Sequence, residues 1–376
     1  MADPFADSKI LFTLPWNSDM VFAVAFIGND KVAAANRRGD ILIWNLPATG
    51  DKSPDPVRRL VGHTRAINCL LLSPDGKTLI SAGNDRTVKF WDAALTTGEP
   101  GQVVLNDGFV RKNQGGTMGL KKISDPPPPV TVNVVVQKPL RELTAHKDWI
   151  WGLALSRDGK TLVTGDDSSE VIVWDTQTGA QQHRWKVKLW VRALDISPDG
   201  KTVVTAENFP QLKFKESDAG VRGWDIQTGE LKFDVSEELK FEMAAVRFSS
   251  DGKYLAICQG NIDRGENEGK VFLLDPSTGK KLRELTPPHH NGATDLAFHP
   301  DRRHLFTSGR DRVVKIFRLS DGKHVRNLGE EDKGQSESLH AISITPDGKL
   351  LAAADGKGQV VVYELDPSSQ EQPSTT

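Results

Sequence analysis

The chain has few cysteines and no marked excess of either charge. Its 376 residues contain two cysteines, Cys69 and Cys258, which are too few for a disulfide framework. The formal net charge is −2 and the sequence pI is about 6.5. A strongly basic domain is the usual mark of a nucleic-acid-binding protein. We therefore expect neither a disulfide-rich secreted fold nor a nucleic-acid partner.

Long apolar runs are absent too. No stretch approaches the roughly 20 apolar residues that a membrane helix needs, and the first ten residues, MADPFADSKI, lack the features of a signal peptide. Hydrophobic residues make up 38% of the chain and charged residues 26%, as in a soluble globular protein. These features predict a cytoplasmic protein that has no membrane partner.

What the sequence does contain is a repeated turn. The segment SPDGKTL at residues 73–79 returns as SRDGKTL at 156–162, SPDGKTV at 197–203, SSDGKYL at 249–255, HPDRRHL at 299–305 and TPDGKLL at 345–351, with a weaker first copy, IGNDKV, at 27–32. Pro-Asp-Gly favours a tight turn, because proline presets φ and glycine accepts a positive φ. The chain therefore carries seven copies of one turn.

The residues ahead of each turn share one apolar pattern. Counted back from the second residue of the turn, the positions seven, four and two residues earlier are apolar in all seven copies. Those seven residues earlier are Val21, Ile67, Ile150, Val191, Met243, Ala293 and Leu339. Short apolar segments between turns, without a helical period, predict β-strands.

A large apolar residue follows each turn and closes a further strand. These residues are Trp44, Trp91, Trp174, Trp224, Leu274, Phe317 and Tyr363. They recur every 43–50 residues, except for the 83 residues between Trp91 and Trp174, which hold one repeat and an insertion. A period of about 40–45 residues is that of a four-stranded propeller blade.

Seven such units resemble the WD-repeat family of β-propellers, over residues from about 8 to about 366. The resemblance rests on Gly62-His63, the turn and Trp91-Asp92 of the second repeat, and on weaker copies of these in other repeats. It implies an all-β fold, a single seven-bladed propeller of four-stranded antiparallel blades. The regular turns are similar to those of bacterial members of the family.

The resemblance also implies structural tetrads, in which Asp, His, Ser or Thr, and Trp link the loops of a blade to its third strand. The expected members are His63, Ser81, Asp85 and Trp91 in blade two; His146, Thr164 and Trp174 in blade three, where Ser168 replaces the aspartate; Asp218 and Trp224 in blade four; and His289, Thr307 and Asp311 in blade six, where Phe317 replaces the tryptophan. Ser, His and Asp also form hydrolase triads. Because these sets recur at fixed offsets, whereas an active site occurs once, we expect a structural role and predict no catalytic or metal-binding residue.

The N-terminus is predicted to close the ring. Leu11 and Leu14 align with Leu140 and Leu143, and the seventh repeat ends without an outer strand. A ring left open would expose a strand edge. We therefore expect residues 9–14 to complete blade seven, and residues 367–376, which lack apolar periodicity, to form a flexible tail.

Three insertions depart from the repeat: about 98–138 in blade two, about 207–220 in blade four and about 259–269 in blade five. The first follows the third strand of blade two, so we expect it to leave the bottom face, with its VNVVV segment along a sheet edge. Its four-proline run suits a docking ligand or, more simply, a stiff spacer. The resemblance places the other two loops on the top face, where Phe209, Leu212 and Phe214 either fold back onto the ring or bind a partner.

Two positions beside the first strand of each repeat do not follow the apolar pattern. In three blades they hold Trp149 and Trp151, Trp190 and Arg192, and Met20 and Phe22. In WD-repeat proteins such positions line the top mouth of the channel, where partners dock, and Trp and Arg are enriched among interface hot spots. We predict a partner-binding surface here. The alternative is that these side chains fill space between blades.

The sequence thus predicts a non-enzymatic scaffold that binds a protein or peptide partner on the top face, without a cofactor, as a monomer or as a component of a larger complex. One alternative is a propeller hydrolase or metal-dependent enzyme with a site in the axial tunnel, for which Glu242, His340 and Asn68 are the available residues. Another is a quinone-cofactor propeller, which rests on the turns WDTQTG and WDIQTG.

Overall fold

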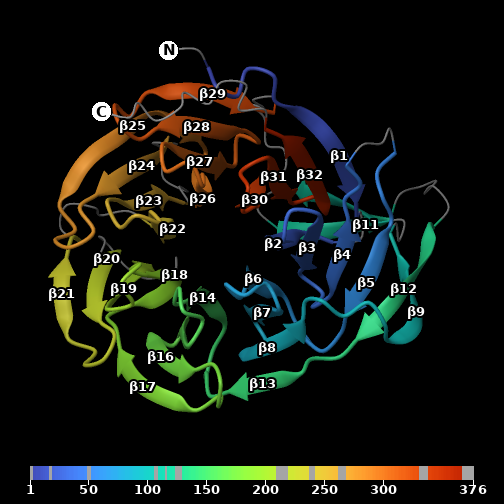
Figure 1. The fold of residues 1–376 in the computed structure, drawn as a ribbon, viewed down its shortest axis with the longest axis horizontal. Helices are drawn as coiled ribbons and strands as arrows, with labels where there is room; N and C mark the ends of the chain where they lie inside the picture. Colours follow the sequence, from blue (N-terminus) through green and yellow to red (C-terminus); the bar gives the residue numbers. More distant parts are fainter. Residues whose placement is uncertain are drawn as a thin grey trace.

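The structure, a computed structural model, describes residues 3–16, 19–48, 52–105, 109–114, 117–122, 129–208, 219–236, 242–260, 268–329 and 338–365. The strands in these ranges form seven blades around a central axis, as predicted (Figure 1). The described residues include no helix that could cross a membrane.

Blades one to three follow one another along the first half of the chain. Blade one contains β2 (Val21–Ile27), β3 (Lys31–Asn36), β4 (Ile41–Asn45) and β5 (Pro56–Leu60); blade two contains β6 (Ile67–Leu72), β7 (Thr78–Gly83), β8 (Thr87–Asp92) and β13 (Arg141–Thr144); blade three contains β14 (Ile150–Leu155), β15 (Thr161–Asp166), β16 (Glu170–Asp175) and β17 (Gln181–Lys186). The first strand of each blade faces the axis, and the fourth strands of blades two and three, β13 and β17, lie at the rim (Figure 1).

The second half of the chain builds the other four blades. Blade four contains β18 (Trp190–Ile196), β19 (Thr202–Asn208), β20 (Gly220–Asp225) and β21 (Leu231–Asp234); blade five contains β22 (Met243–Phe248), β23 (Leu255–Gln259), β24 (Glu268–Leu274) and β25 (Lys281–His290); blade six contains β26 (Ala293–Phe298), β27 (His304–Gly309), β28 (Val314–Arg318) and β29 (His324–Leu328); blade seven contains β30 (Leu339–Ile344), β31 (Leu350–Asp355), β32 (Gln359–Glu364) and β1 (Lys9–Pro15).

The repeated Pro-Asp-Gly segment is the tight turn between the first two strands of a blade. In blade two the backbone N–H of Ser73 donates to the carbonyl of Thr78 at 2.8 Å, and the Asp75 carboxylate accepts from the Ser73 hydroxyl at 2.5 Å. Gly76 has a φ of +72°, which a residue with a side chain rarely adopts. Serine, aspartate and glycine therefore each contribute to this turn.

The apolar pattern ahead of the turns builds the core between neighbouring blades. All seven residues that stand seven positions before a turn are buried: Val21, Ile67, Ile150, Val191, Met243, Ala293 and Leu339. Each cluster of buried side chains joins residues of successive blades, such as Ile67 and Trp91 of blade two with Ile43 of blade one. Burial of this kind is the main stabilising contribution between blades that form separate sheets.

The N-terminal strand closes the ring, as predicted. β1 pairs antiparallel with β32, with Leu14 opposite Val360, and Phe12 and Leu14 are buried against blades seven and one. The closure extends further than predicted, because Phe5 is fully buried and packs edge-on against Phe306 of blade six. Asp3 adds an ion pair with Arg326 at 3.1 Å.

The first insertion adds two strands to the outer edge of the predicted four-stranded blade one. β12 (Thr131–Gln137) pairs parallel with β5, and β9 (Glu99–Val104) pairs antiparallel with β12, so the sheet has six strands. Val103 and Val134 are buried in the core cluster of blade one, which explains why this edge accepts two more strands. The predicted return of the VNVVV segment along a sheet edge is confirmed.

The insertion leaves blade two on the side of the β6–β7 turn, as predicted, because the Ala93 N–H after β8 donates to the carbonyl of Lys77 at 2.9 Å. Its middle contains a two-stranded sheet of β10 (Phe109–Gln114) and β11 (Thr117–Lys122). Several predicted features lie outside the described residues: most of the proline run, the loop of Phe209, Leu212 and Phe214, residues 261–267 and the tail from residue 366.

Candidate functional site

The loops of the ring lie on two faces. Because successive strands of a blade are antiparallel, the loops between second and third strands share one face with the loops that lead from blade to blade. We call this the top face. It carries the tetrads and the variable Trp and Arg residues.

The tetrad of blade two is complete in the structure. Nδ1–H of His63 donates to Asp85 at 2.8 Å, the hydroxyl of Ser81 lies 2.7 Å from His63 Nε2, and the indole N–H of Trp91 donates to Ser81 at 2.8 Å. Burial alone would raise the pKa of Asp85, but the hydrogen bond and the charge of His63 lower this pKa to about 2. The chain of bonds ties the loop before β6 to β8.

Blade three has a full tetrad as well, and the expectation that it lacks the aspartate is wrong. Asp166, two residues before Ser168, accepts from His146 Nδ1 at 2.8 Å, and Thr164 joins His146 to Trp174. The hydroxyl of Ser168 donates to Asp166 at 2.8 Å. The carboxylate can therefore come from the end of the second strand as well as from the turn that follows.

Blade four replaces the tetrad with a buried ion network. Thr205 accepts from the indole of Trp224 at 2.9 Å and donates to Glu207 at 2.8 Å. Glu207 is fully buried and pairs with Arg222 at 2.6 Å. Burial raises the pKa of Glu207, and the Arg222 charge opposes that rise. The other predicted member, Asp218, lies outside the described residues.

In blade six the tetrad histidine lies within hydrogen-bonding distance of the other two tetrad residues. His289 lies 2.8 Å from Asp311 and 2.7 Å from Thr307, and Phe317 is buried in the adjoining core. In blades two, three and six the tetrad histidine contacts a hydroxyl group. The residues that carry these hydroxyls have no solvent exposure: Ser81, Thr164 and Thr307. No substrate can reach them without unfolding of the blade, so the geometry supports a structural role.

The aromatic residues of blades three and four lie together at the top. The guanidinium of Arg192 stacks 4.6 Å from the ring of Trp151 and 5.2 Å from that of Trp190. Asp167 holds this arrangement, since it accepts from the indole of Trp151 at 3.1 Å and pairs with Arg192 at 3.6 Å. Burial raises the pKa of Asp167 to about 6, although Arg192 and Trp151 act in the opposite direction. Trp149, whose backbone carbonyl accepts from the Asp167 N–H at 3.0 Å, is 40% exposed.

The two predicted residues of blade one are placed differently. Met20 is buried, with 7% of its surface exposed, so it presents little area to a partner. Phe22 lies at the mouth of the central channel and packs edge-on against His340 of blade seven. Burial lowers the pKa of His340 to about 4, and the charge of Arg310 acts in the same direction. This imidazole is therefore neutral at pH 7.

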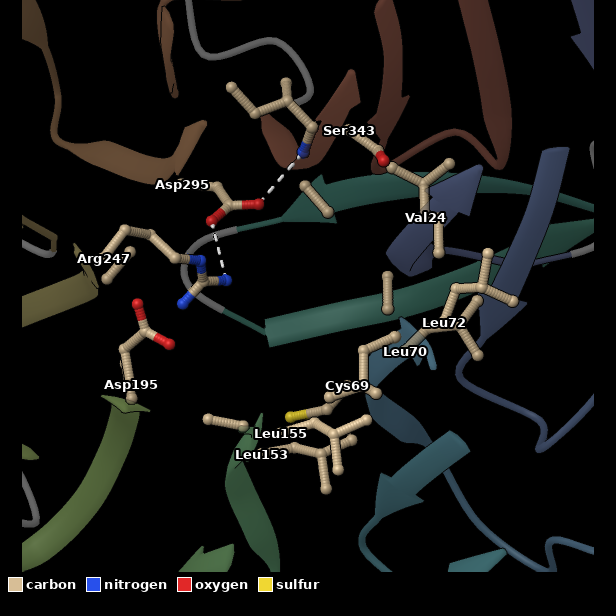
Figure 2. Close-up of a pocket in the computed structure, with 18 of the residues that line it drawn as sticks. Val24, Cys69, Leu70, Leu72, Leu153, Leu155, Asp195, Arg247, Asp295 and Ser343 are labelled. Atoms are coloured by element: carbon tan, nitrogen blue, oxygen red, sulfur yellow. Dashed lines mark hydrogen bonds and ion pairs between the residues drawn. The ribbon is translucent and has the colours of Figure 1, made fainter. Parts of the chain in front are cut away.

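A channel of about 1010 Å³ runs along the axis and is lined by residues of all seven blades. Figure 2 shows Arg247 between Asp195 and Asp295 within it. Arg247 pairs with Asp295 at 3.4 Å. Each carboxylate also accepts a backbone N–H of the next blade: Asp195 from Phe248 at 2.7 Å and Asp295 from Ile342 at 3.0 Å. These groups therefore join adjacent blades.

The sequence contained a signal for this trio that the prediction did not use. Asp295 stands five residues before its turn, and Asp195 and Arg247 stand three residues before theirs. The other blades have mainly Ala, Gly or Leu at these positions. A charged residue at a position that is otherwise small or apolar indicates that the inner strand has a role beyond packing. Here that role is to join adjacent blades.

The alternatives that need a metal or a cofactor gain no support from the geometry. In the described part of the chain, no group of three or more His, Cys, Asp or Glu side chains could hold a metal ion. The Thr-Gly turn of blade three is an ordinary turn, in which Asp175 accepts from the Thr178 N–H at 2.7 Å. Cys69 and Cys258 are free thiols in the described fold.

Comparison with known families agrees with the geometry. The family profile "WD domain, G-beta repeat" matches residues 54–92, and the profile "Outer membrane protein assembly factor BamB" matches residues 137–371, more than half of the chain. The chain is a WD-repeat β-propeller. Its blades three to seven also belong to the family of the second profile. The function named in that description belongs to the assembly factor itself and is not assigned to this chain.

Known WD-repeat proteins are similar over most of the chain. WD repeat-containing protein 1 of Xenopus tropicalis is 23% identical and is aligned over 96% of this chain and 64% of its own length. Autophagy-related protein 16 of Arabidopsis thaliana is 23% identical over 82% of this chain and 49% of its own. The guanine nucleotide-binding protein subunit beta of Solanum tuberosum is 23% identical over 78% of this chain and 79% of its own length. The chain thus spans about half to two thirds of the first two relatives. These similarities support a protein-interaction scaffold in general terms.

Proposed function

We propose that this propeller is a non-enzymatic scaffold that binds a protein or peptide partner through the top of blades three and four. The binding surface consists of Trp149, Trp151, Trp190 and Arg192, with Phe22 across the channel mouth. The same proposal places the protein in the cytoplasm, as its composition suggests.

The exposure of Trp149 is the observation that carries this proposal. The large aromatic residues of the blades serve the core: Trp44 and Trp91 are fully buried. Trp149 is the single aromatic side chain among the exposed large hydrophobics of the described chain. Three of the six other repeats have Ala66, Gly292 and Ser338 at the corresponding position, so the fold does not require an aromatic residue there. Exposed aromatic area that the fold does not need is typical of an interface.

The neighbours of Trp149 are ordered before any partner arrives. Arg192 is fixed between two indole rings and by its ion pair with Asp167. An arginine that is already ordered loses less conformational entropy on binding. Its position against the rings of Trp151 and Trp190 supplies both an apolar contact and a charge that can orient the partner.

The proposal is tested by affinity capture with the intact protein, followed by mass spectrometry. The parent and the Trp149→Ala/Trp190→Ala variant serve as baits at equal concentration. A variant with Leu231→Ala, an exposed apolar residue at the rim of blade four, is the control. The proposal requires a protein that the parent and the control retain and the tryptophan variant loses. Equal capture by all three baits would refute it.

A further inference from the structure

A second surface lies on the top face over blades one and two, and it is basic. Arg37 is in the β3–β4 loop, Arg65 in the loop that leads into β6, and Arg86 in the β7–β8 loop. All three side chains are exposed. We refer to these three residues as the arginine patch.

The three loops of the arginine patch are in contact. A Cβ atom added to Gly39 would lie 2.8 Å from the carbonyl oxygen of Arg65, so the β3–β4 loop packs directly on the next blade's entry loop. The Asn84 N–H at the end of β7 donates to the carbonyl of Ala66 at 2.8 Å. The patch is therefore one continuous surface and not three separate side chains.

The acidic residues near the arginine patch already have partners. Asp19 pairs with Arg38 at 3.3 Å, and Asp40 pairs with Arg59 at 2.8 Å. Asp85 belongs to the tetrad and accepts from His63. Within the part of the chain that the structure describes, the side chains of the arginine patch form no ion pair or hydrogen bond, and three positive charges are left for a ligand.

We propose that the arginine patch binds an acidic segment of a protein partner. Guanidinium groups form paired hydrogen bonds with carboxylates, and they lose less hydration energy than ammonium groups when they do so. Three of them on adjoining loops match several Asp or Glu side chains of one extended segment. This surface differs from the aromatic one of the proposed function, and each can be disrupted without the other.

The charge of the remaining top face argues for a short acidic segment and against a nucleic acid. Blade three carries Asp148 on this face, and blade five carries Glu242. A long polyanion that followed the ring beyond blade two would meet these carboxylates. The net charge of the chain, −2, would also oppose it. Nucleic-acid binding usually needs a wider basic field.

The test measures binding of a fluorescein-labelled peptide of eight glutamates by fluorescence anisotropy at low salt, with a Gly-Ser peptide of equal length as the neutral probe. The variant is Arg37→Glu/Arg65→Glu/Arg86→Glu. The matched control is Lys77→Glu/Lys160→Glu/Lys201→Glu, which changes the net charge equally on the opposite face. Each of these lysines stands two residues after the aspartate of its turn, so the three control positions are equivalent in their repeats. In blade two the Ser73 hydroxyl, and also Lys77, lower the pKa of Asp75.

We expect the arginine variant to bind the glutamate peptide at least tenfold more weakly than the parent, and the lysine control to stay within about twofold. If the arginine variant melts well below the parent, Arg65→Gln/Arg86→Gln replaces it, with an expected loss of about threefold. The Trp149→Ala variant should bind this peptide like the parent, which separates the patch from the proposed function. Equal binding by the parent and the arginine variant, equal loss in the lysine control, or tighter binding of a 20-base-pair DNA than of the peptide would overturn the proposal.

Discussion

His146 Nδ1 lies 2.8 Å from Oδ2 of Asp166, a carboxylate at the end of β15 that performs the role Asp85 has in the turn after β7. Both arrangements place one carboxylate against one imidazole nitrogen at the same distance. The hydrogen-bonding requirement of the buried histidine is therefore conserved between the two blades of this chain, while the source of the acceptor differs.

This relationship predicts which residue blade three needs. Asp166→Ala should lower the free energy of unfolding by about 1–3 kcal/mol, because it leaves the buried His146 N–H without an acceptor. Ser168→Ala should cost less than about 1 kcal/mol, since Asp166 keeps its bond to His146. Urea unfolding of both variants measures the difference. A larger cost in stability for Ser168→Ala than for Asp166→Ala would contradict this prediction. It would support the sequence-based expectation that Ser168 takes the place of the tetrad aspartate.

The aspartate of blade two predicts a dependence on pH. The pKa of Asp85 is about 2 in the fold, below its ordinary value of 3.8. A carboxylate with a lowered pKa stabilises the fold above its ordinary pKa and loses that contribution as the pH falls toward the folded value. Asp85→Ala should therefore cost about 1–3 kcal/mol at pH 7, and less between pH 4 and pH 2. A difference between parent and variant that stays constant from pH 7 to pH 2 would contradict this.

The closing strand predicts a strong effect of truncation. Deletion of residues 1–15 removes β1 and the buried Phe5, Phe12 and Leu14, and it exposes the edge of β32. We expect aggregation, or a melting temperature lower by roughly 10 °C or more. Leu14→Ala should cost about 2–4 kcal/mol, whereas Ile10→Ala, on the same strand but 56% exposed, should cost less than 1 kcal/mol. A truncated protein as soluble and stable as the parent would show that the ring does not depend on β1.

The charged trio of the channel predicts a coupled effect. Burial raises the pKa values of Asp195 and Asp295, and Arg247 limits both rises. Arg247→Met should lower stability by about 1–3 kcal/mol at pH 7, and by less as the pH falls and the two carboxylates take up protons. Adding Asp295→Asn to Arg247→Met should recover part of the loss, as a double-mutant cycle would measure. Additive costs at all pH values would mean that the arginine and the aspartates act independently.

The arrangement of the inner strands could be predicted from the sequence because it depends on local chemistry. The turn at Pro74-Asp75-Gly76 sets a register, and the apolar residue seven positions before the turn is buried in every blade. The closing role of residues 9–14 followed from counting strands. In these cases a residue's neighbours in sequence determine its environment.

The rest depended on contacts that are distant in sequence. The parallel pairing of Val135 with Arg58 joins segments that no repeat relates. The offset rule failed at Asp166 because two backbone positions bring a carboxylate to the same imidazole. The burial of Met20 and the exposure of Trp149 at equivalent positions depend on the packing of neighbouring loops, which the strand pattern does not specify.

The central claim, that the top of blades three and four is a partner-binding surface, is tested most directly by the dissociation constant of the captured partner for three proteins: the parent, Trp149→Ala and Trp91→Ala, each with its unfolding free energy. We predict that Trp149→Ala weakens binding by about 2 kcal/mol, or roughly 30-fold, and costs less than 1 kcal/mol in stability. Trp91→Ala should cost about 3–5 kcal/mol in stability, because core and tetrad are lost together. Equal destabilisation at both positions with unchanged partner affinity for Trp149→Ala would contradict the account and assign Trp149 to packing.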